Sequence, residues 1–394
     1  MSHSVPSPTV LAALVLILFA LAGPARPVAA AEAAPLASEL HERVDRVPVT
    51  VQPLYGDAHR GEMIITQFRP DGDGPFPAVI MHHGRSPTNR AETPRFRYLD
   101  VVRYWTRRGF AVFVPTRIGY GDAGLTPDPE DSGRCQARQY DVAARAVTVQ
   151  SLAAIDFAQR QPWVDPKRII VMGQSMGGFT TIVTMAARHA GVIAGINFAG
   201  GGGGDPASRR GNPCSPGRMS DVFAAAGRAN AGATPTLWLY AENDGYWGDA
   251  LPRRWFAAYT EAGGKGEFVG FPPVGDEGHR LLARGMALWR PVLDRFLDGL
   301  GVKAPHSVGA PAASGWAAID DPSRVPRVKP EVREKGYRAF LAADVPRAFA
   351  IGPKGEWAYR TGTDAMARTL ERCAEYAGAP CRLYAVDDAV VWRE

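Results

Sequence analysis

The sequence has few of the features that are typical of proteins that bind nucleic acid, span membranes or hold metal ions. It contains no block of Lys and Arg with interleaved aromatic residues, and its formal net charge is only +5 over 394 residues. Nucleic acid is therefore not an expected partner. No internal repeat is present. The remaining composition, 46% hydrophobic and 22% charged, is that of a globular protein, and the length predicts two or three domains.

Cysteine is scarce, with only Cys135, Cys214, Cys373 and Cys381 in the whole chain. Their spacing offers no CxxC pair and no His-rich pattern, so we expect no metal site and no cofactor. An even number favours disulfides and an oxidising compartment. Four cysteines allow three connectivities, and the short separation of the last two favours Cys373 with Cys381 and Cys135 with Cys214.

The chain also lacks an apolar run of the ~20 residues that a membrane-spanning helix needs. The run from Val10 to Ala22 is shorter, and Ala29-Ala30-Ala31-Glu32 follows it with the small residues that a signal peptidase reads. We interpret residues 1–31 as a cleaved secretory signal. The expected protein is periplasmic or secreted, with no stable membrane anchor after cleavage. An uncleaved anchor or a different start is the alternative.

Strands and helices alternate along most of the chain, which predicts an α/β protein. Two opening strands without a helix, followed by strand and helix in turn, indicate a mostly parallel sheet with helices on both faces. Such sheets carry their chemistry at the carboxyl ends of the strands. The predicted strands are 47–55, 62–68, 76–82, 110–115, 168–173, 192–198, 234–240 and 268–271, and the predicted helices are 94–108, 140–159, 251–262 and 283–300, the last kinked or restarted at Pro291.

A change in composition divides the chain near its C-terminus. Residues 32–302 form the predicted main domain, and residues 303–325, rich in Pro, Ala, Ser and Gly, have the composition of a linker. Beyond it, residues 326–394 are predicted to form a small α+β accessory domain. A domain of that size buries little apolar surface, so a disulfide contributes more of its stability than it would in a larger domain.

One short motif suggests a nucleophile. Gly173-Gln174-Ser175-Met176-Gly177 follows an apolar strand and precedes an apolar helix. In that context Gly-x-Ser-x-Gly is a nucleophile elbow, a sharp turn that holds Ser175 in a strained conformation. The glycines are required because side chains there would collide with the neighbouring strand and helix. The alternative is a glycine-rich turn with an incidental serine.

Candidate partners for Ser175 follow later strands. Asp244 comes just after the strand 234–240, and His279 lies in a loop after the strand 268–271. Acyl transfer by serine needs a base and a carboxylate that orients it. The order Ser, Asp, His is the order found in hydrolases built on such a sheet. Glu242 competes with Asp244 for the acid, and an exposed loop histidine is the alternative for His279.

Two backbone amides are candidate donors to a developing oxyanion. One belongs to Met176, which follows the nucleophile, and the other to Arg85, in the loop after the first buried strand. His82 and His83 point to opposite faces because they are adjacent on a strand, so we expect packing or loop-bracing roles for them rather than a metal pair. The glycine tract 200–204 lacks the Lys-Ser/Thr pair of a phosphate loop and is interpreted as an active-site rim.

Residues 47–300 resemble the α/β-hydrolases, and within them the dienelactone-hydrolase-like and prolyl-oligopeptidase-like serine branch. The resemblance rests on the motifs Met81-His82-His83-Gly84, Gly173-Gln174-Ser175-Met176-Gly177-Gly178, Asp244 and Gly278-His279. It implies an eight-stranded sheet and a triad of Ser175, Asp244 and His279. Authentic dienelactone hydrolases use a cysteine nucleophile, where this chain has serine. Prolyl oligopeptidases carry a large propeller, for which this chain has no room.

The C-terminal segment has a vaguer resemblance. Residues 346–351 and 383–388 are similar to an accessory domain found behind secreted hydrolases, and this similarity implies no activity. The sequence as a whole predicts an exported serine hydrolase that cleaves a small-molecule carboxylic ester through an acyl-enzyme. A peptidase or amidase of the same fold is one alternative. A non-catalytic binding protein built on the same scaffold is another.

Overall fold

The computed structural model describes residues 1–3, 36–86, 88–124, 127–302, 310–343, 345–362 and 365–393. All but the first three residues of the predicted signal, and residues 303–309 of the predicted linker, lie outside the described residues. Within these ranges, no helix has the length and hydrophobicity required to cross a membrane.

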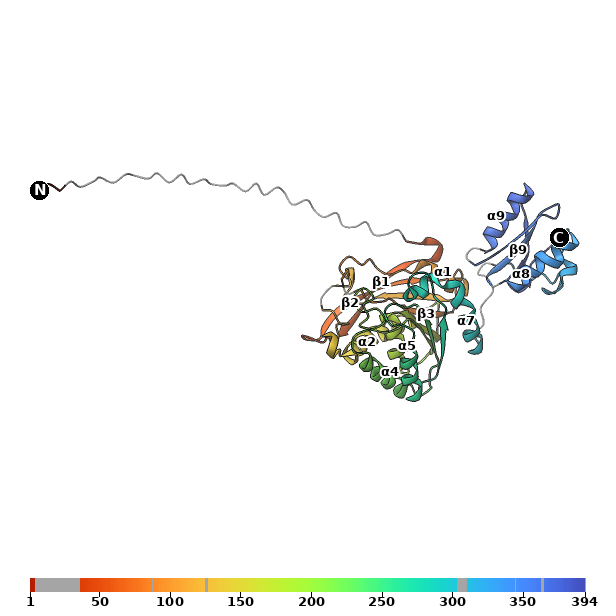
Figure 1. Cartoon of the computed structure of the whole chain (residues 1–394). Coiled ribbons are helices and arrows are strands. Elements are labelled where there is room, and N and C mark those ends of the chain that lie inside the picture. The colour runs from red at the N-terminus through yellow and green to blue at the C-terminus, as the bar shows by residue number, and fades with distance from the viewer. Residues whose placement is uncertain are drawn as a thin grey trace. The chain divides into compact units, whose positions relative to one another are not determined.

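The main domain contains an eight-stranded sheet in the order β1-β2-β4-β3-β5-β6-β7-β8 (Figure 1). β1 and β2 pair antiparallel, β2 pairs antiparallel with β4, and the remaining neighbours are parallel. This confirms the predicted, mostly parallel sheet. The strands are β1 Arg43–Val51, β2 His59–Phe68, β3 Phe76–His82, β4 Ala111–Thr116, β5 Val164–Gln174, β6 Val192–Phe198, β7 Thr236–Ala241 and β8 Gly266–Phe271.

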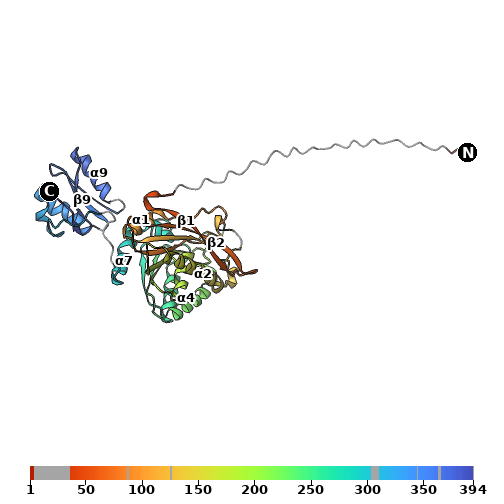
Figure 2. The ribbon, with the colours of Figure 1, turned by 180° about the vertical axis from the view of Figure 1, so that it is seen from behind.

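Alternate residues of the central strands pack into different layers. Ile170 and Met172 of β5 join a core with α1 and α7, whereas Ile169 and Val171 join a core with α2. Because side chains alternate across a strand, an unbroken apolar strand can serve both cores. Figure 2 shows the sheet and the helices that cover it from behind. The helices are α1 Leu99–Arg107, α2 Tyr140–Gln159, α3 Met176–Met185, α4 Pro216–Asn230, α5 Ala250–Glu261, α6 Leu281–Arg284 and α7 Met286–Gly299.

Two helix predictions need correction, and one helix was missed. The helix predicted from residue 94 begins only at Leu99, after Tyr98 with a left-handed φ of 50°. The predicted C-terminal helix is interrupted at Gly285 and not at Pro291, which lies inside α7. A Cβ on Gly285 would lie 2.8 Å from the backbone carbonyl oxygen of Leu281, so the tight turn between the helices requires glycine. Helix α4 was not predicted at all.

The C-terminal module, residues 310–393 as described, has its own antiparallel sheet in the order β10-β9-β11-β12. Ala350 and Ala358 pack on one face with Cys373 of α9, and Phe349 packs on the other face with Tyr337. Its elements are the π-helical turn Val332–Tyr337, α8 Arg338–Ala342, β9 Arg347–Ile351, β10 Trp357–Thr361, α9 Ala365–Ala377, β11 Arg382–Val386 and β12 Ala389–Val390.

The packed part of this module begins earlier than the sequence predicts. Residues 310–325 were assigned to the linker, but Val325 is fully buried and Trp316 packs on the module's core. The hydroxyl of Tyr337 also donates a hydrogen bond to the Ile319 carbonyl at 2.8 Å. Apolar residues within a Pro- and Ala-rich segment therefore extend the small core.

Two disulfides are present, and both follow the pairing that the sequence favours. Cys135 is bonded to Cys214 across 79 residues, and Cys373 is bonded to Cys381 across eight. The first connects the loop after β4 to the loop after β6. The second connects α9 to the chain entering β11.

Candidate active site

Ser175 lies in a sharp turn between the last residue of β5 and the first residue of α3. Its backbone has φ 59° and ψ −122°, a conformation that costs a residue with a side chain of the order of 1–3 kcal/mol. A Cβ on Gly173 would lie 2.4 Å from the carbonyl carbon of Gly177, and one on Gly177 would lie 2.1 Å from the His82 oxygen. The turn therefore closes only with glycine at both positions, as the motif predicts.

Asp244 and His279 meet in the loops after β7 and β8. Nδ1 of His279 lies 3.0 Å from Oδ2 of Asp244. The other carboxylate oxygen accepts the backbone N–H groups of Tyr246 at 2.8 Å and Trp247 at 3.2 Å. Both members of the pair are buried, whereas Glu242 is exposed. A carboxylate bonded to Nδ1–H leaves Nε2 of His279 as a proton acceptor.

Glu277 connects the two loops, a contact that the sequence analysis did not foresee. Its Oε1 accepts the backbone N–H of Gly245 at 2.7 Å and that of His279 at 3.1 Å. On the other side, Nε2 of Gln174 donates to the His279 carbonyl at 2.8 Å. The histidine backbone is thus held from two directions. The sequence feature that could have indicated this contact is an acidic residue, Glu277, two positions before the candidate base His279.

Two aromatic rings enclose the imidazole and were also missed. Tyr246 stacks on His279 with ring centroids 3.9 Å apart, and Trp247 meets it edge-on at 5.4 Å. Trp247 is itself fixed because its Nε1 donates to the Ala199 carbonyl at 2.8 Å. These residues follow Asp244 almost directly in the sequence, so one loop supplies both the acid and the walls of the imidazole.

The predicted oxyanion donors lie around Ser175. A Cβ on Gly84 would lie only 3.3 Å from Ser175 Cβ, so the loop after β3 passes directly beside the serine. Arg85, Met176 and Ser175 line the same cavity. Met176 is the first residue of α3, where the helix leaves backbone N–H groups unpaired and has its positive end.

His83 holds the neighbouring peptide in place. Its Nδ1 and the Gly84 carbonyl are 2.7 Å apart, and its Nε2 accepts the N–H of Arg117 at 3.1 Å. These contacts require the tautomer with the proton on Nδ1. Burial, with the nearby positive charge of Arg117 second, holds the pKa of His83 well below its ordinary value. The ring therefore stays neutral and fixes the peptide whose other end carries the Arg85 N–H.

His82, the last residue of β3, has a different partner from His83, which follows the strand and is not part of it as the sequence analysis assumed. Its Nε2 lies 2.9 Å from the hydroxyl of Ser151 on α2. Burial, and then the charge of Arg117, also lowers its pKa well below the ordinary value. In the part of the chain that the structure describes, no group of three or more His, Cys, Asp or Glu side chains is arranged to hold a metal ion.

The side chain of Arg85 belongs to a charge network at the pocket edge. Its guanidinium binds both carboxylate oxygens of Asp128, at 2.9 and 2.7 Å. Burial disfavours the ionised form of Asp128, but hydrogen bonds and charge from Arg85, together with Arg90, outweigh it and lower the pKa of the carboxyl. Glu130 lies beyond, bonded to the buried Arg117. The network fixes the loop that carries the Arg85 amide.

A cavity of about 550 Å³ opens beside Ser175. Part of its wall is the glycine tract, and the Cys135–Cys214 disulfide joins the two loops that form its rim. The hydroxyl of Tyr140 lies 2.6 Å from the Cys214 carbonyl oxygen and 3.1 Å from that of Gly202 and shares its one proton between them, which connects the glycine tract to that bridge. The lining residues are Arg85, Ser86, Thr88, Glu130, Ser132, Arg138, Ser175, Met176, Gly201, Gly202, Gly203, Gly204, Asp205, Pro206, Ala207, Arg209, Tyr246 and Trp247.

Comparison with known proteins shows that one segment of the chain matches a family model. Residues 96–196, which include the turn at Ser175, match the model of the prolyl oligopeptidase family. No curated protein sequence matches the chain.

Among solved structures, the chain is similar to a Klebsiella pneumoniae protein described as a dienelactone hydrolase, at 17% identity and a TM-score of 0.43, over 66% of this chain and 99% of that one. It is similar to a puromycin-hydrolysing peptidase of Mycobacterium tuberculosis at 19% identity and a TM-score of 0.47, over 68% of this chain but only 40% of that one. It is also similar to an acetyl xylan esterase from Paenibacillus sp. R4 at 18% identity and a TM-score of 0.42, over 66% and 89% of the two chains.

These neighbours differ in activity, and their identities are too low to carry a substrate over to this chain. The strand order, the turn at the end of β5 and the matched segment agree with one another. The chain therefore has the α/β-hydrolase fold, and its residues 96–196 are similar to the prolyl oligopeptidase family.

Proposed function

We propose that the protein is an exported serine hydrolase that cleaves carboxylic esters of small molecules. The observation that carries the proposal is the oriented pair of His279 and Asp244, which lies behind Tyr246 and Trp247 in the wall of a cavity that Ser175 also lines. A volume of about 550 Å³ falls within the ~300–1,000 Å³ typical of small-molecule sites. The bridged rim and the fixed glycine tract give this cavity a defined wall.

In the proposed reaction, Ser175 Oγ attacks the ester carbonyl carbon while Nε2 of His279 takes its proton. The tetrahedral oxyanion accepts hydrogen bonds from the backbone N–H groups of Arg85 and Met176. His279 then gives the proton to the departing alcohol oxygen as the ester bond breaks, which leaves an acyl-enzyme. In the second half of the reaction, His279 takes a proton from a water molecule as the water oxygen attacks the acyl carbon. The bond from that carbon to Ser175 Oγ then breaks, Ser175 regains a proton from His279, and the carboxylic acid is released. Asp244 keeps the imidazole oriented and balances its charge.

Cleavage of peptides or amides is the second candidate, because the matched family model is that of oligopeptidases. The same nucleophile and base serve both reactions. They differ in the leaving group, since an amine must be protonated as it departs. A panel of acyl p-nitrophenyl esters and N-blocked aminoacyl p-nitroanilides separates them by kcat/KM.

Each kcat/KM is divided by the kcat/KM of a reference serine peptidase measured on the same substrate. The esterase proposal predicts that the resulting ratio is larger for the best ester than for the best anilide. Ser175→Ala should abolish turnover of both classes. An anilide preference would make the protein a peptidase. Turnover by Ser175→Ala at the parental rate would reject the serine mechanism for either substrate.

Export is supported by the two disulfides, because such bonds persist in oxidising compartments. Peptide mapping of the protein from its native host under non-reducing conditions tests this part of the proposal. We expect both bridges and an N-terminus at Ala31 or Glu32. Four free thiols in that sample would reject both the pairing and the compartment.

A further inference from the structure

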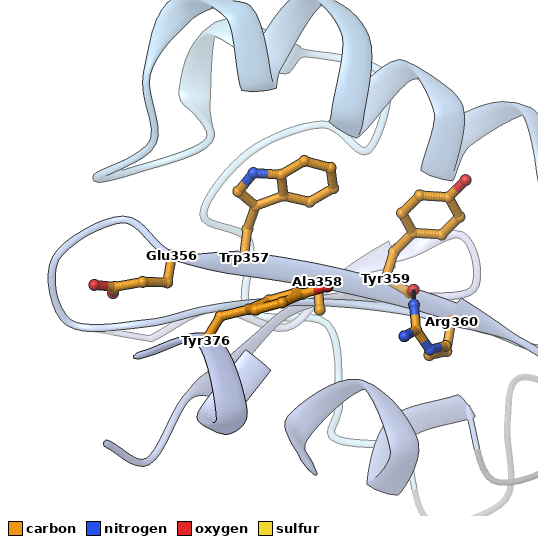
Figure 3. Close-up of a pocket in the computed structure, with 6 residues that line it drawn as sticks. All are labelled: Glu356, Trp357, Ala358, Tyr359, Arg360 and Tyr376. Carbon is orange, nitrogen blue, oxygen red and sulfur yellow. Dashed lines mark hydrogen bonds between the residues drawn. The ribbon is translucent and has the colours of Figure 1, made fainter. Parts of the chain in front are cut away.

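β10 forms an open edge of the C-terminal module's sheet. Among the described strands, it pairs on one side with β9 and on the other side with none. A cavity of about 400 Å³ lies along this edge, lined by residues 356–360 and by Tyr376 of α9 (Figure 3). An unpaired edge presents backbone donors and acceptors that a further strand can use.

The register with β9 tells which backbone groups face outward. The Glu356 carbonyl accepts the N–H of Gly352, and the Pro346 carbonyl accepts the N–H of Gly362, both at 2.7 Å. Even-numbered residues of this segment therefore bond to β9. In an antiparallel sheet the residues between them turn their N–H and C=O groups the other way. Those of Trp357 and Tyr359 consequently point out from the edge.

The side chains along β10 alternate between two faces. Trp357 and Tyr359 lie on one face with nearly parallel rings, 6.4 Å apart and inclined by 4° (Figure 3). Ala358 lies on the other face, where it is buried against α9. Glu356 and Arg360 flank it, one at each end of the segment, and both are partly exposed.

This order of residues is self-complementary. If a second β10 runs antiparallel with Ala358 opposite Ala358, then Glu356 lies opposite Arg360 at both ends. Trp357 then lies opposite Tyr359, and those are the residues whose backbone groups point outward. The same register thus satisfies the edge hydrogen bonds, the charges and the aromatic pairs, each of which stabilises paired strands.

We propose that β10 is a homodimer interface, at which two copies of this chain join their four-stranded sheets into one of eight strands about a two-fold axis at Ala358. In the single chain, Nη1 of Arg360 bonds the carbonyl of its own neighbour Tyr359 at 2.9 Å. Pairing replaces that bond with the Trp357 N–H of the second copy. The guanidinium is then free to bind the opposing Glu356.

The test is a charge reversal followed by analytical ultracentrifugation of the exported chain, residues 32–394, over a range of concentrations. Glu356→Arg and Arg360→Glu each place like charges opposite one another, twice per dimer. Each should raise the dimer dissociation constant by at least about tenfold. The double variant E356R/R360E restores opposite charges at both ends, so its dissociation constant should return to within about threefold of the parental value.

Arg338→Glu is the matched control. Arg338 is an exposed residue of the same module, paired with Glu334 of the π-helical turn that precedes α8. Its reversal changes the net charge as Arg360→Glu does, and should leave the dissociation constant unchanged. Circular dichroism and ester turnover establish that each variant is folded.

A parental protein that is monomeric at all concentrations overturns the proposal, as does a dimer in which the single reversals have no effect. Single variants that dissociate without rescue by the double variant also reject this register. If the monomer instead binds extended peptides along the edge, β10 is a peptide-binding strand and not a dimer interface.

Discussion

His279 is held by its surroundings more closely than a loop residue usually is. Asp244 fixes its Nδ1, Tyr246 stacks on its ring, and Glu277 and Gln174 bind its backbone. A base held this way loses little entropy when the transition state forms, since its orientation is set in advance.

Replacing Asp244 by Asn keeps the size of the side chain but removes its charge. The amide can present an N–H to the imidazole and favour the wrong tautomer, so kcat should fall about 10³- to 10⁴-fold. Glu242→Gln is the control, because Glu242 is exposed and should leave kcat near the parental value. Steady-state ester kinetics distinguish the two. The reverse pattern would move the acid to Glu242.

Glu277 should act as a positioning residue. Glu277→Ala removes the acceptor shared by the Gly245 and His279 amides, and we expect kcat to fall about 10- to 100-fold with a smaller change in KM. Glu277→Gln retains a carbonyl acceptor and should recover most of the loss. If both variants lose activity equally, the charge of Glu277 matters rather than its hydrogen bonds.

At this scale the sequence singled out Ser175, Asp244 and His279 as candidates, because the order of residues along the chain and their places after strands can be read from the sequence, and the structure brings Asp244 and His279 into contact. It did not reveal Glu277, Tyr246 or the partners of Arg85. Those contacts depend on how two loops from different strands meet. The hydrogen bond to His279 and the burial of the side chain distinguish Asp244 from the exposed Glu242 as the candidate acid.

Among the elements, long apolar strands were predicted well and irregular helices poorly. β3 and residues 169–172 of β5 are so apolar that few alternatives exist, whereas the polar first residues of β5 were not predicted as strand. Helix α4 was missed, although Met219, Phe223 and Ala226 have helical spacing. Gly227 lies in it because a Cβ there would be 2.1 Å from the Tyr259 carbonyl of α5, and small residues that permit such close packing weaken the apolar signal.

The two disulfides should differ in effect because they close loops of different length. Chain-entropy arguments give about 4.5 kcal/mol for the bridge across 79 residues and about 2.6 kcal/mol for the bridge across eight. Cys135→Ala/Cys214→Ala should therefore lower the melting temperature more than Cys373→Ala/Cys381→Ala. The first pair should also raise KM, because it joins the pocket's rim loops. Unchanged ester KM without that bridge would contradict the assigned role of the rim.

For the whole molecule, the neutral histidines His82 and His83 predict a pH dependence of stability. Their pKa values are well below the ordinary value in the folded protein, whereas the unfolded chain has pKa values of about 6.5. Below that pH the unfolded state binds protons that the folded state does not. The free energy of unfolding therefore falls as pH decreases, by up to about 1.4 kcal/mol per pH unit for each histidine.

Chemical denaturation of the parent and of His83→Gln between pH 7.5 and 5 measures this effect. The variant should show a shallower loss of stability, because one of the two groups no longer titrates. Glutamine can also keep a donor toward the Gly84 carbonyl. Identical slopes for the two proteins would mean that His83 gains its proton in the folded state.

The central claim is that Ser175 is a nucleophile activated by His279. The most direct measurement is labelling of the folded protein by a fluorophosphonate, followed by mass spectrometry of the modified peptide. The account predicts one modified residue, Ser175, formed at a rate that falls by orders of magnitude in His279→Ala. No labelling of the folded parent, or modification at another residue, would contradict it.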